Sequence, residues 1–229
     1  MAAAGFGYWA GFGPTSQVFG SFPYEAPSPE RLVALTFDDG PNEPYTSRLL
    51  DVLEEREVPA TFFAVGRCAE RFPSTTRRLV EAGHVLGNHS YRHQLTRYVA
   101  EPSQRREIQR GQQALARVAG VIPALYRPPW LCHWPWVLRT VANGGLQVVS
   151  GRFAHPLEIF QPPASLMTAR AAKKARPGRI LIFHDGFDAR GGRRDQSVAA
   201  IGPLIDTLTR QSYQFVTVDR LLGVPAYLG

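Results

Sequence analysis

The sequence is poor in cysteine, in long hydrophobic runs and in internal repeats, and each absence excludes a class of protein. Its 229 residues include two cysteines, Cys68 and Cys132, which are too few for a disulfide framework. We expect free thiols, with a single bridge between them as the alternative. No run of about 18 apolar residues is present, so no membrane-spanning segment is expected. No segment repeats at a period of about 20–50 residues, which excludes solenoids and propellers.

The composition is that of a basic globular protein. Hydrophobic residues make up 44% of the chain, which is enough to build a core and excludes wholesale disorder. The 26 Lys and Arg residues outnumber the 19 Asp and Glu residues, so the net charge is +7. Such a surface favours anionic partners, namely nucleic acid, anionic lipid or an acidic wall polymer. The basic residues are scattered in small groups without a nucleic-acid-binding motif, so nucleic acid is not an expected partner.

The first thirty residues differ in composition from the rest of the chain. The segment Met1–Ala26 contains one charged residue, Glu25, and many glycines, alanines and aromatic residues. It lacks the basic n-region of a secretory signal. Because glycines interrupt its apolar stretch, we expect 1–30 to be an extended arm that packs on a single domain formed by 31–229. The alternative is the stub of an upstream anchor.

Beyond the arm, short apolar runs alternate with longer segments whose apolar residues follow helical spacing. About seven such β/α units predict a parallel sheet, either closed into a barrel or open and doubly wound. The predicted strands span 32–37, 60–65, 85–88, 124–126, 146–149, 179–183 and 214–218, and the predicted helices span 45–57, 69–82, 102–119, 135–143, 165–175 and 197–211.

Polar side chains follow three of the predicted strands. Asp38 and Asp39 follow the first strand, His89 follows the third, and His184 follows the strand at 179–183. Active sites of parallel α/β proteins form at the carboxyl ends of the strands, so we expect these side chains to converge. Each feature alone also has a structural interpretation: Asp-Gly-Pro is common in turns, and histidines are common at surfaces and core edges.

The spacing of these residues predicts distinct chemical roles. Adjacent aspartates at a strand end diverge, so one can bind a metal while the other acts as a base. His89 and His93 are spaced i, i+4, which on a helical turn places both imidazoles on one face. Two imidazoles and a carboxylate suit Zn²⁺ and leave coordination positions open. His184 has the chemistry of a general acid, because the ordinary histidine pKa is about 6.5.

A loop rich in proline and aromatic residues completes the set. Arg127 opens the segment Arg-Pro-Pro-Trp, whose two prolines rigidify the backbone. A fixed arginine can hold a carboxylate ionised and oriented. Aromatic residues gather nearby and either stack against sugar rings or pack in the core: Tyr126, Trp130, Trp134 and Trp136.

Four of these segments resemble, in order, the motifs of the polysaccharide deacetylase family, the NodB-homology domain of carbohydrate esterase family 4. They are Thr-Phe-Asp-Asp-Gly-Pro at 36–41, His-Ser-Tyr-Arg-His at 89–93, Arg-Pro-Pro-Trp at 127–130 and Leu-Ile-Phe-His-Asp at 181–185. The resemblance covers about 31–218. It implies a distorted (β/α)7-type barrel, with 31–229 as the catalytic domain, and a metal-dependent hydrolase of N-acetylated sugars.

The resemblance also implies a role for each matching residue. The metal ligands are Asp39, His89 and His93, and the ion is most simply Zn²⁺, or a similar ion such as Co²⁺. The catalytic residues are Asp38 as the general base, Arg127 as the group that holds this base, and His184 as the general acid. The substrate-binding residues are Trp130, whose backbone N–H stabilises the oxyanion, Ile182, which lines the acetyl-methyl pocket, Pro128 and Tyr91.

One motif departs from the family pattern. Members usually carry an acidic residue at the end of the strand that precedes the histidine strand, where it tunes the catalytic histidine. No aspartate occurs in 150–158 of this chain. Without a carboxylate, the pKa of His184 would be lower. Glu158, Asp185 and Asp188 are the candidate substitutes, and a weakened or differently tuned enzyme is the alternative.

The leading interpretation is an N-deacetylase of a peptidoglycan or chitin-like glycan. The alternatives are an O-deacetylase, such as an acetylxylan esterase, and a carbohydrate-binding pseudoenzyme that retains its metal. The partner is then a glycan, an association with the cell envelope fits the basic surface, and the family implies an extracellular or cell-envelope location, although no signal peptide is visible.

Overall fold

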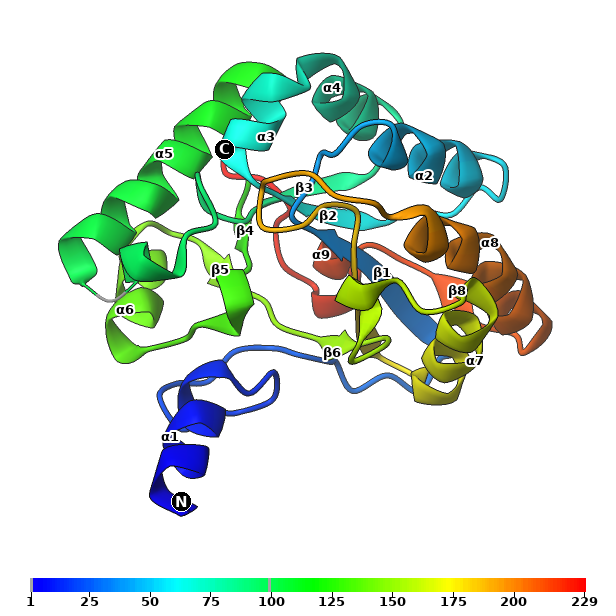
Figure 1. The fold of residues 1–229 in the computed structure, drawn as a ribbon, viewed down its shortest axis with the longest axis horizontal. Helices are drawn as coiled ribbons and strands as arrows, with labels where there is room; N and C mark the ends of the chain where they lie inside the picture. The colour runs from blue at the N-terminus through cyan, green and yellow to red at the C-terminus, as the bar shows by residue number, and fades with distance from the viewer. Residues whose placement is uncertain (1, 99) are drawn as a thin grey trace.

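A computed structural model describes residues 2–98 and 100–229 as an α/β fold around one parallel sheet (Figure 1). The strands are β1 (Leu32–Asp38), β2 (Thr61–Ala64), β3 (Val85–Asn88), β4 (Leu125–Tyr126), β5 (Gln147–Val148), β6 (Arg152–Phe153), β7 (Arg179–His184) and β8 (Gln214–Phe215). The helices are α1 (Ala2–Phe12), α2 (Tyr45–Glu54), α3 (Gly66–Arg71), α4 (Pro73–Glu81), α5 (Glu101–Ala119), α6 (Pro135–Asn143), α7 (Ala164–Lys174), α8 (Asp195–Arg210) and α9 (Val218–Leu222). Short 3₁₀ turns are η1 (Leu95–Tyr98), η2 (Pro129–Leu131) and η3 (Glu158–Phe160).

The sheet is a curled, incompletely closed barrel. Its strand order is β5-β4-β3-β2-β1-β7-β6, with β8 also paired to the start of β1, and every pairing is parallel. Among the described residues, β5 and β6 do not pair, so the barrel stays open between them. The N-terminal arm runs past this opening, where the N–H of Ser150 donates to the carbonyl of Pro23 (2.8 Å). The predicted distorted barrel is confirmed.

Apolar side chains on both faces of β1 explain its central position. Phe37 packs against Phe62 of β2 and Phe183 of β7, with ring centroids 5.0 and 5.9 Å apart. The surrounding helices are amphipathic and bury one face each against the sheet; α8, for example, buries Leu204 and Leu208. Both cysteines are buried free thiols, as expected.

Several predicted boundaries differ from the structure. The predicted helix 69–82 is two helices, α3 and α4, because Pro73 starts a new helix after the non-helical Phe72. The predicted strand 214–218 ends at Phe215, and Val218 begins α9 instead. The two-residue strand β6 was not predicted, since no apolar run marks it.

The expectation of a wholly extended arm is wrong for 2–12, which form α1. Alanine-rich sequence favours a helix, and its glycines allow close packing: a Cβ on Gly11 would lie 2.9 Å from the Trp134 ring. The helix ends before Gly13 and Pro14, and the following residues run along the domain. None of the helices in the described part of the chain has the length and apolar character needed to cross a membrane.

Candidate active site

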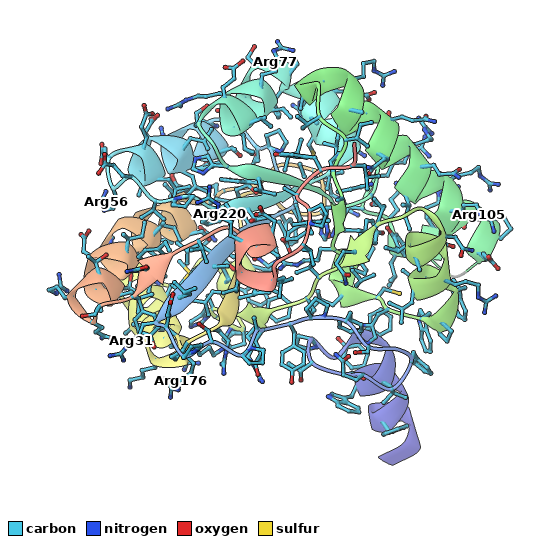
Figure 2. All side chains as sticks on the ribbon, turned by 180° about the vertical axis from the view of Figure 1, so that it is seen from behind. Arg31, Arg56, Arg77, Arg105, Arg176 and Arg220 are labelled. Atoms are coloured by element: carbon cyan, nitrogen blue, oxygen red, sulfur yellow. The ribbon has the colours of Figure 1, made fainter. Side chains whose placement is uncertain are left out.

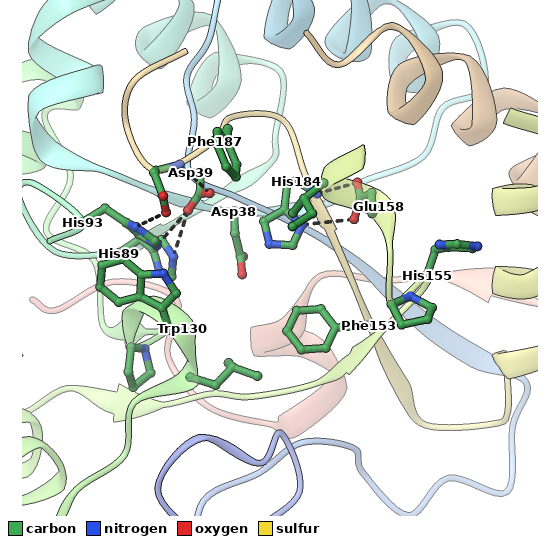
Figure 3. A pocket seen from close by; sticks show the side chains of 15 residues that line it. Asp38, Asp39, His89, His93, Trp130, Phe153, His155, Glu158, His184 and Phe187 are labelled. Carbon is green, nitrogen blue, oxygen red and sulfur yellow. Dashed lines mark hydrogen bonds and ion pairs between the residues drawn. The ribbon is translucent and has the colours of Figure 1, made fainter. Parts of the chain in front are cut away.

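A cavity of about 360 Å³ opens at the carboxyl ends of β1, β3 and β7 (Figure 3). The sheet register accounts for its position, because Asp38 at the end of β1 lies opposite His184 at the end of β7. The cavity is lined by Asp38, Asp39, His89, His93, Pro128, Trp130, Leu131, Phe153, His155, Pro156, Glu158, Ile159, His184, Phe187 and Asp188.

The three predicted metal ligands meet at one end of this cavity. The Oδ1 atom of Asp39 lies 3.3 Å from Nε2 of His89 and 3.0 Å from Nε2 of His93. One ligand atom from each residue lies within 4.8 Å of the other two, and all three side chains are buried. Asp39 Oδ1 is a buried acceptor without a hydrogen-bond donor. An orphaned carboxylate oxygen facing two imidazole nitrogens fits a divalent cation such as Zn²⁺.

Contacts at the Nδ1 atoms of both histidines orient the rings so that the Nε2 atoms face Asp39. His89 Nδ1 lies 2.7 Å from the carbonyl oxygen of Arg127, and His93 Nδ1 lies 3.0 Å from Asp188 Oδ1. In His89 the Nδ1–H is therefore the donor, which leaves Nε2 to face a metal, whereas His93 makes an ion-pair contact with Asp188. The backbone N–H of Asp188 also donates to Asp39 Oδ2 (3.0 Å). The sequence named Asp188 only as a substitute partner of His184, so this supporting role was missed.

The charges of this cluster favour a bound cation. Burial by itself raises the pKa of Asp39, but the neighbouring His93 and His89 outweigh it and hold this pKa well below its usual value. Burial alone would lower the pKa of His93, yet the Asp39 and Asp188 carboxylates raise it to about 10. The same carboxylates that retain a proton here would also stabilise a metal ion.

The backbone between the two histidines is a bend and not the predicted helical turn. Asp39, Ser90 and His93 have φ angles of 75°, 68° and 54°, in the left-handed region that non-glycine residues seldom adopt. Glycine makes room for this loop, because a Cβ on Gly111 of α5 would lie 2.8 Å from the Ser90 carbonyl oxygen. Strained backbone at two predicted ligands, Asp39 and His93, is typical of a functional site.

Asp38 is held by a fully buried arginine. Arg127 Nη1 donates to Asp38 Oδ1 and to Thr36 Oγ1, each at 2.7 Å. The remaining guanidinium donors bind the carbonyl oxygens of Val149 and Ser150, so Arg127 is fixed from all sides. The predicted pairing of Arg127 with Asp38 is therefore present, and Figure 3 shows Asp38 between the predicted metal ligands and His184.

Of the three candidate substitutes for the missing acidic residue, Glu158 is the one that contacts His184. Its Oε2 lies 3.0 Å from His184 Nδ1, and its Oε1 accepts hydrogen bonds from the His184 N–H (3.0 Å) and Ser197 Oγ (2.8 Å). Burial lowers the pKa of His184, but the Glu158 carboxylate outweighs this effect and raises the pKa to about 9. The other two candidates have different partners, since Asp185 accepts from Thr46 (2.6 Å) and Asp188 pairs with His93.

The predicted substrate-binding residues divide into two groups. Pro128 and Trp130 line the cavity, and the Trp130 ring packs on His93 with centroids 4.1 Å apart. Tyr91 instead donates to Glu70 (2.9 Å) at the surface and lies outside the cavity lining. Ile182 is fully buried one step below His184 on β7 and is not a lining residue, because Gly151 packs over it.

Apolar residues that the sequence did not single out line the cavity instead. They include Leu131, Phe153 and Phe187. The Phe153 ring lies parallel to His184, with an interplanar angle of 10° and centroids 6.1 Å apart. Trp134 and Trp136 stack on each other 5.5 Å apart, away from the cavity, so their packing interpretation is correct.

Comparisons with known proteins agree with this geometry. Residues 25–149 match the family model described as polysaccharide deacetylase. The chain is 32% identical over 200 residues to a peptidoglycan-N-acetylglucosamine deacetylase of Bacillus cereus, covering 87% of this chain and 92% of the relative. It is 34% identical over 183 residues to a chitooligosaccharide deacetylase of Sinorhizobium fredii, covering 77% and 85%. The crystal structure of the Bc1960 peptidoglycan N-acetylglucosamine deacetylase superposes with a TM-score of 0.81 at 29% identity, covering 90% of this chain and 94% of that one.

Proposed function

The chain belongs to the polysaccharide deacetylase family, and we propose that it is a metal-dependent hydrolase that removes N-acetyl groups from GlcNAc-type sugars of a glycan. One observation carries the proposal. A single cavity is lined by the Asp39–His89–His93 cluster, by Asp38, which pairs with the buried Arg127, and by the His184–Glu158 pair. Amide hydrolysis requires an activated nucleophile, stabilisation of the oxyanion and a proton for the leaving amine, and a metal site with a base and an acid around one bond can supply all three.

Asp39, His89 and His93 would hold one divalent ion, and their donor set suits Zn²⁺, with Co²⁺ as a similar ion. A bound ion of this kind lowers the pKa of water and polarises a carbonyl. The orphaned Oδ1 atom of Asp39 supports its position. Apart from this ion and the attacking water, the base, the acid and the oxyanion donor are groups of the protein itself.

Asp38 is the proposed general base. Its Oδ1 is occupied by Arg127, which keeps the carboxylate oriented toward the cavity and leaves Oδ2 to take a proton from the attacking water. The backbone N–H of Trp130, on the rigid loop that follows Arg127, is the proposed donor to the developing oxyanion. Loss of one such donor typically costs about 3–4 kcal/mol of transition-state stabilisation.

His184 is the proposed general acid, because an amide nitrogen leaves poorly without a proton. Its pKa of about 9 keeps the imidazole protonated at neutral pH. Because Glu158 contacts Nδ1, the proton on Nε2 is the one that His184 would deliver to the leaving amine. Positioning and protonation of the acid thus depend on one buried carboxylate.

The proposed substrate is peptidoglycan or a chitin-like oligosaccharide, since the relatives carry the names of deacetylases for these glycans. A cavity of about 360 Å³ suits one sugar residue, because it is near the lower end of the roughly 300–1,000 Å³ of ligand pockets. Such a substrate places the enzyme outside the cell or in the cell envelope, where the basic surface can meet anionic components.

Acetate release tests the proposal. The zinc-loaded protein is incubated with N-acetylchitooligosaccharide and with peptidoglycan, each with and without a chelator. Chelator-sensitive release is the expected result. Acetate release that is unchanged by the chelator would contradict a metal-dependent reaction. If protein with stoichiometric metal released no acetate from either substrate, an ester substrate or a pseudoenzyme would be favoured. An acetylated xylan then separates these two outcomes.

A further inference from the structure

Helix α1 presents aromatic side chains to solvent. Phe6, Tyr8 and Trp9 are 59%, 71% and 46% exposed, and the helix carries no charged side chain. Its last residue, Phe12, packs edge-on against Trp134 with centroids 6.0 Å apart, so the end of α1 is fixed to the domain. The preceding turns project away from the domain (Figure 1). Phe6 packs on Trp9 and Tyr8 stacks on Phe12, with centroids 6.1 and 5.3 Å apart, yet much of each exposed ring remains open to solvent.

A cluster of cationic side chains lies beside the end of the arm, where Glu25 contacts two of them. We define it as the basic cluster: Arg152, Arg170, Lys174, Arg176 and Arg179. Arg170 and Lys174 lie one turn apart on α7, and the carbonyls of Lys174 and Lys173 at its end accept hydrogen bonds from Arg179 (3.3 Å) and Arg176 (3.0 Å). Glu25 of the arm pairs with Arg179 (3.0 Å) and Arg152 (3.5 Å) and neutralises only part of this charge.

A groove lies between the arm and the basic cluster. It has a volume of about 680 Å³ and is lined by arm residues that include Gln17, Ser21 and Tyr24, and by Pro177 and Arg179 of the domain. Figures 1 and 2 show opposite sides of the molecule, and α1 lies along the lower edge in both. Figure 2 places Arg176 and Arg31 along this edge as well. The arm thus leads from α1 past the groove to Glu25 and the basic cluster, along one edge of the molecule.

We propose that this surface docks onto an anionic lipid bilayer. Trp and Tyr favour the membrane–water interface, where the ring is in an apolar layer and the polar tip reaches the headgroups. The exposed aromatic side chains of α1, which has no charged residue, would enter this interface. The basic cluster would then face the phosphate groups, to which each nearby cation is attracted.

The chemistry of α1 favours a lipid surface over a wall polymer. Aromatic rings can also stack on sugar rings, but the hydroxyl groups of a polysaccharide or glycerol-phosphate chain need polar partners beside them. The exposed side chains Phe6, Tyr8 and Trp9 offer one hydroxyl and one N–H among three aromatic rings. None of the residues of this surface lines the active-site cavity, so the inference goes beyond the proposed deacetylase activity.

Sedimentation with vesicles tests the proposal. The full chain is mixed with vesicles of phosphatidylcholine, or of phosphatidylcholine and phosphatidylglycerol in equal parts. We expect binding to the anionic vesicles that weakens with added salt. A double substitution Phe6→Ser with Trp9→Ser should weaken binding, and so should Arg170→Glu with Arg176→Glu, the latter by at least about tenfold. All four side chains are exposed.

Arg77→Glu with Arg106→Glu is the matched control. It makes the same charge change at exposed positions of α4 and α5 and should bind almost normally. No sedimentation with either vesicle, or an equal loss in this control, would overturn the proposal. Acetate release from a soluble oligosaccharide checks that each variant is folded. If no variant and no parent protein releases acetate while vesicle binding follows the substitutions, the proposed function fails and the docking surface stands.

Discussion

At the scale of single residues, Asp38 and Asp39 are neighbours with different surroundings. Asp38 faces a buried arginine, whereas Asp39 faces two imidazoles. The same substitution should therefore have different effects. We expect Asp39→Asn to lose the metal, and Asp38→Asn to keep it while turnover falls by about 10²–10⁴-fold, the usual contribution of a general base. Asparagine tolerates the positive φ of position 39, which alanine would not.

Metal content and rate, measured on both variants, separate the two roles. Asp38→Asn also leaves the Arg127 cation buried without its charge partner, which costs stability. A thermal unfolding curve must therefore show that this variant is folded at the assay temperature. A folded Asp38→Asn enzyme with full activity would contradict the assignment of the base.

Glu158 controls the protonation of His184, so it should control the alkaline limb of the pH–rate profile. A general acid must be protonated, and activity is lost as the pH rises through its pKa of about 9. In Glu158→Gln the raising effect of the carboxylate is gone and burial remains, so the alkaline limb should move to lower pH. Because the folded pKa lies above the ordinary 6.5, the pair also stabilises the fold below about pH 6.5, and this stabilisation is lost as the pH rises toward 9.

The matched control for this experiment is Asp195→Asn, which removes a partly exposed carboxylate at the start of α8, outside the cavity. It should leave the alkaline limb in place. Metal content should be unchanged in both variants. An unshifted limb in Glu158→Gln would mean that His184 is not the group whose protonation limits the rate.

At the scale of elements, a helical glycine makes the loop of the predicted ligands fit. Alanine is normally better than glycine inside a helix by about 1 kcal/mol. In α5 the opposite should hold, because a Cβ on Gly111 would lie 2.6 Å from Asn88 Oδ1 and 2.8 Å from the Ser90 carbonyl carbon and oxygen. Backbone cannot yield as a flexible side chain can. We expect Gly111→Ala to lower both the thermal midpoint and the metal affinity.

The control is Gly7→Ala in α1, where a Cβ would meet nothing within 4 Å. That substitution should be neutral or slightly stabilising. Calorimetry gives the midpoint of each variant, and zinc titration gives the affinity. If Gly111→Ala proved as harmless as Gly7→Ala, the loop 89–93 would be more adaptable than its packing implies.

The strands and their polar ends could be predicted because both signals are local. The apolar run of β1 and the aspartates that follow it are adjacent in the sequence, as are His184 and β7. The bend at 89–93 could not be predicted, because its positive φ angles depend on packing against α5. Nor could α1 be predicted, since its fit depends on a glycine facing the distant Trp134.

At the scale of the whole molecule, the site is assembled from segments that are far apart in the sequence. The residue types of the predicted ligands, base and acid were readable, because parallel strands bring their carboxyl ends together. The contacts between those segments were not. Asp188, which contacts His93, and Glu158, which contacts His184, come from segments without a strand signal. Local packing turns Tyr91 toward Glu70 and buries Ile182 outside the cavity.

Assembly from distant segments links metal binding to folding of the whole chain. Asp39 follows β1 whereas His89 and His93 follow β3, so an unfolded chain cannot hold all three together. A ligand that binds only the folded state stabilises it by about 2.7 kcal/mol at a free concentration 100 times its Kd. Zinc should therefore raise the thermal midpoint, and a chelator should lower it.

Differential scanning calorimetry at several zinc concentrations measures this shift. Asp39→Asn should abolish it, because the charged ligand is lost. Glu158→Gln removes a buried carboxylate of the same cavity that is not a predicted ligand, so it should retain the shift. This pair of variants distinguishes binding at the predicted site from binding elsewhere on the protein. If zinc raised the thermal midpoint of Asp39→Asn as much as that of the parent protein, the stabilising ion would bind outside the Asp39–His89–His93 cluster. The buried Oδ1 atom of Asp39 would then not contribute to zinc-linked stability.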